Sequence, residues 1–93
     1  MNMDTSHYQI PDEIRQNYLA RRSKDIQDCS VKLLSRDWAY FERLGHQLKG
    51  NAASYGYREL GRIAFEIEIS ALNKDLLRLK KYVNAFKHWF LQT

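Results

Sequence analysis

Proline occurs only once in this chain of 93 residues, at Pro11, and its four glycines all lie between residues 45 and 61. Proline and glycine form most of the turns in β proteins, and no Asn-Gly or Asp-Gly pair is present to close a hairpin. Such a chain can form long uninterrupted helices, but it has few residues that could join many short strands. The sequence therefore predicts an all-α fold.

Apolar residues recur at helical spacing in four successive segments, each bounded by residues that begin or end helices. In chain order, we expect helices over residues 11–35, 37–55, 57–73 and 75–93. The connections between them are short, which favours antiparallel neighbours. We therefore expect an antiparallel up-down four-helix bundle over residues 11–93, preceded by a short flexible N-terminal tail over residues 1–10.

The same patterns assign residues to the core and to the surface. In the third helix, Phe65, Ile69 and Leu72 are expected to widen an apolar face that already makes this helix the most buried. Cys29 is expected to be a small buried apolar residue. Arg21 and Arg22 form a basic pair of the kind that usually marks a solvated face, and the pattern of the first helix allows a kink beside them.

The charge and the cysteine content limit the classes of function. The net charge of +4 suits an acidic partner, but the basic residues do not cluster as they do in nucleic-acid-binding proteins. A single cysteine excludes an intramolecular disulfide and a cysteine-based zinc site, which fits a reducing compartment. Neither an apolar run of membrane-spanning length nor a secretory signal pattern is present. We expect a cytoplasmic protein that binds neither nucleic acid nor membrane.

His46 is expected to lie on the solvent side of the second helix. At about 100° of rotation per residue, Phe41, Leu44 and Leu48 fall on the opposite side of that helix. The side that carries His46 also carries Ala39, Glu42, Lys49, Gly50 and Ala53. An exposed, unpaired histidine is mostly neutral near pH 7, and its lone pair can attack phosphorus. We therefore expect His46 to be a nucleophile.

Neighbours of His46 are expected to assist it. Lys49 lies one turn later on the same side and can neutralise part of the charge on a phosphoryl group, while Gln47 can donate a hydrogen bond. Gly50 has no reason in the core to be small, so we expect a docking partner to approach there. The expected partner contacts are Glu42, Arg43, Gly50 and Ala53.

The segment Leu44-Gly45-His46-Gln47-Leu48-Lys49-Gly50 strongly resembles the signature of histidine-containing phosphotransfer (HPt) domains. The resemblance continues in Ala52-Ala53, Tyr55-Gly56 and Leu60, and it is close over about residues 40 to 70. Asn51 departs from the small serine that often follows the Lys-Gly pair. Structural roles are expected for Gly45 in helix packing, for Gly56 in the turn and for Leu60 beyond it.

The resemblance implies a phosphoryl carrier of a two-component phosphorelay. His46 would accept a phosphoryl group from an aspartate of a receiver domain and pass it to another receiver, while the chain itself would have no kinase activity. The sequence has no nucleotide-binding glycine loop, and the receiver is expected to supply the Mg²⁺. Response-regulator receivers and a hybrid histidine kinase are the expected partners of a monomeric protein that binds no cofactor or metal.

Two alternatives belong to other classes of function. A degenerate HPt-like bundle would act as an adaptor that binds a kinase or a receiver without carrying phosphate. A helix-turn-helix DNA-binding protein is the second alternative, because Ala52 and Gly56 between two helices mimic its turn. The third helix is largely apolar and carries Glu66 and Glu68, which disfavours recognition of bases.

Overall fold

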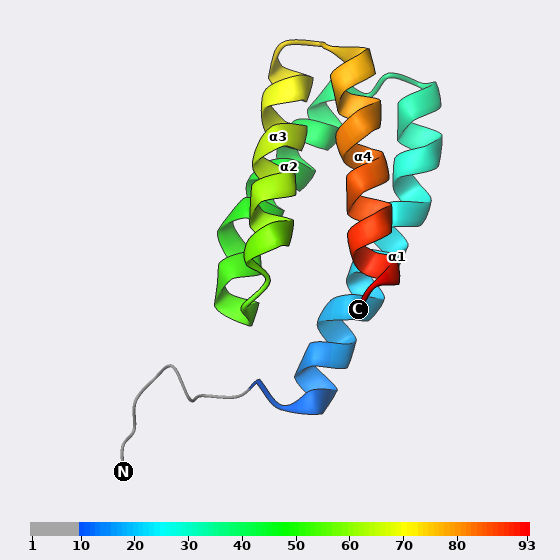
Figure 1. The fold of residues 1–93 in the computed structure, drawn as a ribbon. Coiled ribbons are helices and arrows are strands. Elements are labelled where there is room, and N and C mark those ends of the chain that lie inside the picture. Colours follow the sequence, from blue (N-terminus) through cyan, green and yellow to red (C-terminus); the bar gives the residue numbers. More distant parts are fainter. Residues whose placement is uncertain (1–9) are drawn as a thin grey trace.

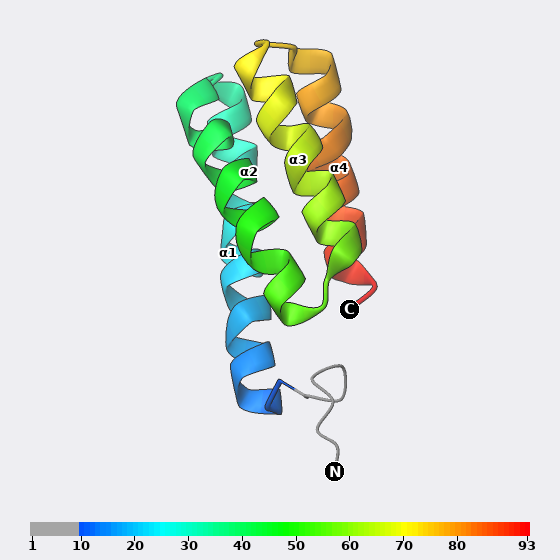
Figure 2. The same cartoon turned by 90° about the vertical axis from the view of Figure 1, so that its left-hand side faces the viewer.

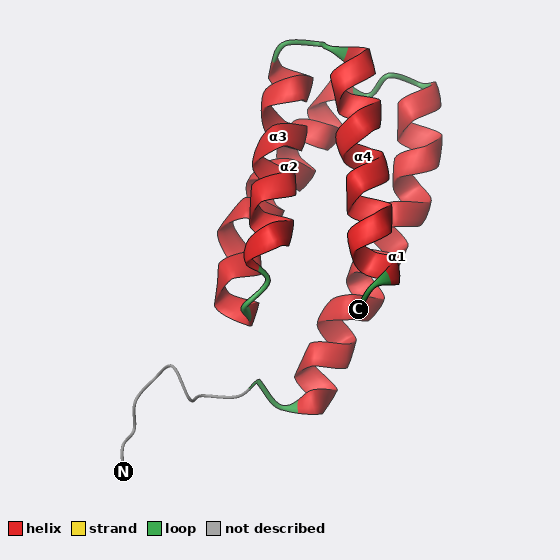
Figure 3. Cartoon of the chain, viewed as in Figure 1, coloured by secondary structure: helices red, strands yellow, loops and turns green. Residues whose placement is uncertain are grey.

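The computed structural model describes residues 10–93, which form four α-helices joined by short turns. The helices are α1 (Asp12–Leu34), α2 (Trp38–Ala52), α3 (Arg58–Leu72) and α4 (Leu76–Leu91), and a short 3₁₀ helix, η2 (Ala53–Tyr55), follows α2. Successive helices run in opposite directions side by side (Figures 1 and 2), and the described part of the chain contains only helices and loops (Figure 3). The predicted all-α fold is confirmed. Apart from Ile10, the predicted tail lies outside the described residues.

The predicted ends of the helices agree with the structure to within three residues, and α1 is a single continuous helix across Arg21 and Arg22. Arg22 is nevertheless not a solvated residue, as the sequence pattern had indicated. It is buried, its guanidinium lies 4.4 Å from the centre of the Tyr18 ring, and its Nε donates to Asp25 at 2.8 Å. Contacts with the aromatic ring and the carboxylate offset the desolvation cost of burying this cation.

All three turns between helices use the same backbone motif. Arg36, Gly56 and Lys74 have left-handed φ values of 52°, 80° and 52°. In each turn, the N–H of this residue donates to the carbonyl three residues before it, and the next N–H donates to the carbonyl five residues before it, at 2.9–3.1 Å. These are the two hydrogen bonds of a Schellman motif, which satisfy carbonyls at the end of a helix. Only Gly56 is the residue type that this motif prefers.

An aspartate follows the left-handed residue in two of these turns and begins the next helix. Asp37 accepts a hydrogen bond from the backbone N–H of Tyr40, and Asp75 accepts one from that of Arg78, each at 3.1 Å. These contacts satisfy N–H groups that have no partner within the helix. One short segment therefore ends one helix and starts the next, which holds neighbouring helices antiparallel.

The core runs along the centre of the bundle and receives side chains from all four helices. Its largest fully buried members include Phe41 and Leu48 from α2, Leu60 from α3 and Phe86 from α4. Cys29 contributes from α1, and burial raises the pKa of its thiol to about 12, so the expectation of a buried apolar cysteine is correct. None of the helices in residues 10–93 is long and apolar enough to cross a membrane.

The expectation that Phe65 and Leu72 widen the buried face of α3 is wrong. Phe65 is 45% exposed and Leu72 is 54% exposed. The buried side of α3 faces α2 and α4, and it is already filled by Leu60, Ile63, Ala64, Ile67 and Ala71. The outer side of α3 therefore presents apolar side chains to solvent.

Helices α2 and α3 form the most extensive helix pair of the bundle, and Gly45 lies between them. A Cβ atom at Gly45 would lie 2.7 Å from the carbonyl oxygen of Ala64 and 2.7 Å from the backbone nitrogen of Glu68. Because both atoms belong to the backbone of α3, they cannot turn aside as a side chain could. The expected packing role of Gly45 is thus explained by the geometry.

We predict that Arg36→Gly raises the free energy of unfolding by about 0.5 to 1 kcal/mol. A left-handed conformation costs a residue with a Cβ roughly 1–2 kcal/mol, and the larger entropy of glycine in the unfolded chain removes part of this gain. Urea denaturation followed by circular dichroism would measure the change. Gly56→Ala is the converse variant and should be destabilised, so an unchanged or opposite result for the pair would contradict the assignment.

The glycines at positions 45 and 50 are predicted to respond in opposite ways to alanine. Gly45→Ala should lower the free energy of unfolding by about 1 to 3 kcal/mol, because the methyl group meets the backbone of α3. Gly50→Ala should be neutral or stabilising by up to about 1 kcal/mol, because its Cβ would enter open space within a helix. Equal effects in thermal or urea unfolding would contradict the packing described for Gly45.

Candidate functional site

His46 lies in the middle of α2 and points away from the core. Its side chain is 72% exposed, whereas Phe41, Leu44 and Leu48 on the other side of the helix are buried. The orientation follows from the amphipathic pattern of α2, whose start is fixed by the cap at Asp37. The expected exposure of His46 is therefore observed.

The expectation that His46 is unpaired is wrong. Nδ1 of His46 lies 3.2 Å from Oε2 of Glu68, a residue of the neighbouring helix α3. The Glu68 side chain is only 16% exposed, so the carboxylate lies partly covered beneath the imidazole. It can reach His46 because Gly45, next to His46, lets the backbone of α3 approach α2 closely.

This contact selects the tautomer of a neutral imidazole. A carboxylate only accepts hydrogen bonds, so the neutral ring must carry its proton on Nδ1 and donate it to Glu68. The other ring nitrogen, Nε2, then keeps its lone pair. Because His46 is largely exposed, that lone pair is accessible from solvent.

Lys49 binds the second oxygen of the same carboxylate. Its Nζ lies 2.8 Å from Oε1 of Glu68, so Glu68 contacts His46 with one oxygen and Lys49 with the other. The nearby ammonium of Lys49 holds the pKa of the Glu68 carboxyl below its ordinary value, and His46 contributes in the same direction. Since the pKa is depressed on folding, the contribution of this group to stability is present at neutral pH and is lost only in acid, as the pH falls below about 4.

A shallow hollow surrounds the imidazole. Its volume is about 270 Å³, and it is lined by Glu42, Arg43, His46, Gln47 and Glu68. Of the residues expected around the site, Glu42, Arg43 and Gln47 thus lie together with His46. Gly50 lies exposed on the same side of α2 but does not line this hollow, and a Cβ there would meet no neighbouring atom.

Other expected site residues lie near the end of α2. Ala53 and Gly56 line a second hollow of about 270 Å³ together with Arg58 and Gly61 of the next helix. Leu60, expected to be structural, is fully buried in the core. The residues that line this second hollow shape the surface at the end of α2 and the start of α3.

Asn51 has a specific contact in place of the small serine that the sequence pattern favours. Its side-chain oxygen accepts a hydrogen bond from the hydroxyl of Tyr18 at 2.6 Å. The Tyr18 ring stacks on Tyr55 with 4.0 Å between ring centroids. Asn51 therefore fixes the last turn of α2 to α1, directly behind the segment that carries His46 and Lys49.

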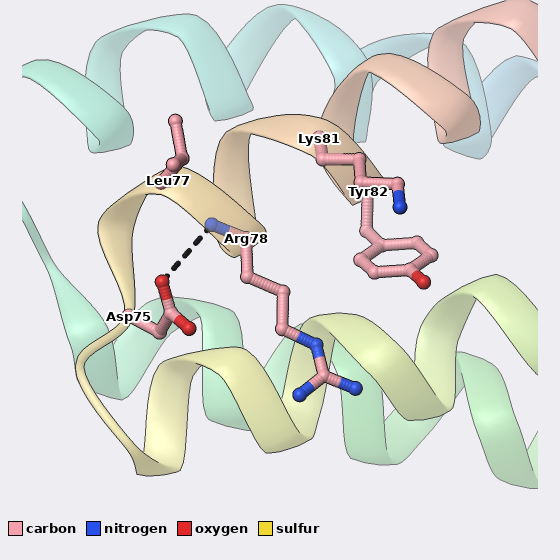
Figure 4. Close-up of a pocket in the computed structure, with 5 residues that line it drawn as sticks. All are labelled: Asp75, Leu77, Arg78, Lys81 and Tyr82. Carbon is pink, nitrogen blue, oxygen red and sulfur yellow. Dashed lines mark hydrogen bonds between the residues drawn. The ribbon is translucent and has the colours of Figure 1, made fainter.

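A larger hollow, of about 630 Å³, lies on α4 and shares no residue with the hollow at His46. It is lined by Asp75, Leu77, Arg78, Lys81 and Tyr82 (Figure 4). Asp75 is occupied in capping α4, and the Arg78 guanidinium reaches Glu66 of α3. Neither a histidine nor a cysteine lies among these residues. Within residues 10–93, no group of three or more His, Cys, Asp or Glu side chains is placed to hold a metal ion.

Glu68 is the site residue that the sequence did not identify. Its only signal was its position one residue after the buried Ile67 on the most apolar helix, where a carboxylate needs a partner. The partner comes from a different helix, 22 residues earlier in the chain. Helical periodicity gives the faces of each helix separately and does not indicate which residues of two helices meet.

The site can be compared with known proteins once its geometry is established. A family model described as Hpt domain matches residues 13–89 of the chain, which include all four helices in whole or large part. No curated protein and no solved structure matches the chain significantly. The chain therefore belongs to the Hpt domain family, whose members take part in histidine phosphotransfer in two-component signalling.

Proposed function

We propose that this protein carries a phosphoryl group on Nε2 of His46, which it receives from an aspartyl phosphate of one receiver domain and passes to another. The observation that carries this proposal is the contact between Nδ1 of His46 and the Glu68 carboxylate, 3.2 Å apart. It fixes the proton on one side of the ring and leaves the lone pair of the other nitrogen exposed.

On this chain, the transfer step uses only His46 and Glu68. The Nε2 lone pair forms a bond to phosphorus while the bond between phosphorus and the aspartyl oxygen breaks, and the aspartate leaves as a carboxylate. The imidazole becomes positively charged in this step. Glu68 opposes that charge through its hydrogen bond to Nδ1, and the reverse step regenerates the neutral ring.

Lys49 is placed to respond to the phosphoryl group. Its side chain is 40% exposed and lies on the same side of α2 as His46, with the ammonium 2.8 Å from Oε1 of Glu68. A phosphoryl group on His46 would bring a second anion within reach of this flexible side chain. Lys49 then shares its charge between Glu68 and phosphate, and Gln47 at the rim of the hollow supplies a further hydrogen-bond donor.

The remaining elements of the reaction are assigned to the partners. We infer that the receiver provides Mg²⁺ and the aspartate, that a hybrid histidine kinase stands upstream, and that this chain acts as a cytoplasmic monomer without kinase activity. Contacts with the receiver would involve Glu42 and Arg43, which line the hollow at His46, and the exposed Gly50 and Ala53 towards the end of α2. Helix α3, which a helix-turn-helix protein would insert into DNA, packs between α2 and α4.

We predict that His46→Gln abolishes phosphate uptake and leaves the fold intact, since the imidazole is mostly in solvent. The protein would be incubated with a panel of receiver domains carrying aspartyl phosphate, and label that is labile in acid and stable in base would be measured on this chain. Wild-type protein is expected to be labelled and the variant unlabelled.

His88→Gln is the matched control, because His88 is exposed on α4 and outside the hollow at His46. It should be labelled as the wild type is. Absence of label on the folded wild-type protein with every receiver would contradict the carrier function and favour the adaptor that binds without carrying phosphate.

Glu68→Gln is predicted to slow phosphate uptake about tenfold without abolishing it. The amide removes the negative charge that stabilises the charged ring, and a hydrogen bond to a charged group is worth about 1.5 kcal/mol, close to one factor of ten in rate. Initial rates from a single phosphorylated receiver would be compared at pH 7 and 8. Unaltered rates at both pH values would show that Glu68 has no part in the transfer.

A further inference from the structure

The imidazole of His46 has two different flanks on the surface of the bundle. On one side of α2 lies α3, which carries Glu68 and the exposed Phe65. On the other side lies α1, which contributes Asp25 and Asp28 to a small hollow that also includes residues of α2. A partner that reaches His46 must also cover one of these flanks, and the two differ in chemistry.

The flank formed by α3 is apolar and exposed. Phe65 and Leu72 are 45% and 54% exposed, and Ile69 between them is half-buried. Their spacing of four and three residues places them along one side of α3. This stripe is the outward side of the helix that supplies Glu68 to the site, and Phe65 and Leu72 are exposed there. Burial of such side chains by a partner would favour association.

The apolar stripe is continuous with the site at His46. The ammonium of Lys49 lies 5.6 Å from the centre of the Phe65 ring and 2.8 Å from Oε1 of Glu68. Glu68 in turn lies 3.2 Å from the imidazole. Phe65 therefore borders the cluster of His46, Lys49 and Glu68 that would carry the phosphoryl group. Its contact with this cluster is through Lys49.

Towards the start of α3, the same flank is hollowed and carries a positive charge. The hollow of about 270 Å³ is lined by Ala53, Gly56, Arg58 and Gly61. A Cβ at Gly61 would meet only the Ala52 methyl group at 3.8 Å, so the packing of the chain itself does not require glycine there. Arg58 is exposed and has no ion-pair partner among the described residues. A receiver whose phosphorylated pocket is acidic is complementary to this surface.

The flank formed by α1 offers less to the same partner. Its hollow of about 130 Å³ is lined by Asp25, Asp28, Tyr40, Arg43, Leu44 and Gln47, none of which is an exposed large apolar residue. Asp25 and Asp28 each pair with a cation on their own helix at 2.8 Å. A partner would have to displace water from charged groups there, and the exposed apolar residues of α1, Ile14, Val31 and Leu34, do not line this hollow.

We propose that the receiver docks over α2 and α3, with Phe65 as the central apolar contact beside His46, and not over α1 and α2. This inference rests on the proposed carrier function and adds the docking face and its main anchor. It requires that the loss of the Phe65 ring weakens docking without changing the chemistry at His46.

The test compares two phosphoryl donors. The first is a receiver domain carrying aspartyl phosphate, which must dock, and the second is phosphoramidate, a small donor that releases ammonia as its nitrogen–phosphorus bond breaks and needs no docking surface. Phe65→Ser should lower the rate of transfer from the receiver by about tenfold, as expected for a central interface residue, and should leave labelling by phosphoramidate within twofold of wild type.

Two further variants serve as controls. Leu77→Ser removes an apolar side chain that is 82% exposed on α4, and Asp28→Asn removes a carboxylate on the α1 flank. Both should transfer phosphate from the receiver within twofold of wild type. A tenfold loss in Asp28→Asn with normal transfer to Phe65→Ser would overturn the proposed face, as would equal slowing of Phe65→Ser with both donors.

Amide chemical shifts of the wild-type protein provide a second measurement that does not depend on the stability of any variant. Addition of unphosphorylated receiver should shift amides over residues 58–72 more than amides over residues 22–31. The reverse order would overturn the docking face while leaving the carrier function intact. Labelling by phosphoramidate without transfer from any receiver would overturn the carrier function and the docking face together.

Discussion

The close approach of α2 and α3 at Gly45 is the constraint on which the site depends. Any larger residue there would place its Cβ within 2.7 Å of the backbone of α3, next to Glu68. The approach brings a partly covered carboxylate under an exposed imidazole on another helix. The sequence around His46 therefore determines helix packing as well as chemistry. Gly45 allows α3 to approach α2, and Glu68 of α3 can then join His46 and Lys49.

The second constraint is the left-handed backbone conformation in each turn, which different residue types adopt. Gly56 occupies the left-handed position of one turn, while Arg36 and Lys74 occupy the same position in the two others, with the same pair of hydrogen bonds. Each of these basic residues is followed by an aspartate that caps the next helix. The favourable cap and the satisfied carbonyls together offset the strain at a residue with a Cβ. The turns hold the helices antiparallel without needing glycine at every position.

The sequence predicted the helices well because their boundaries are local. Asp37, Gly56 and Asp75 mark them directly, and the apolar spacing of α2 predicted the exposed side of His46. Features that depend on contacts between helices were missed. Glu68 was not identified, and Phe65 was assigned to the buried face, because periodicity cannot tell how much of an apolar face the neighbouring helices will cover.

For the proposed phosphoryl transfer, the exposure of His46 has two opposing effects. An imidazole that is 72% exposed can be reached by a docked receiver, but charges in contact with water interact weakly. Glu68, at 16% exposure, lies in less water than His46 and can act more strongly on the ring. Lys49 lies 2.8 Å from Oε1 of Glu68, so the charges of these two groups offset each other. On the proposed function, a phosphoryl group on His46 would add negative charge to the cluster, which would favour release from an acidic partner once the transfer is complete.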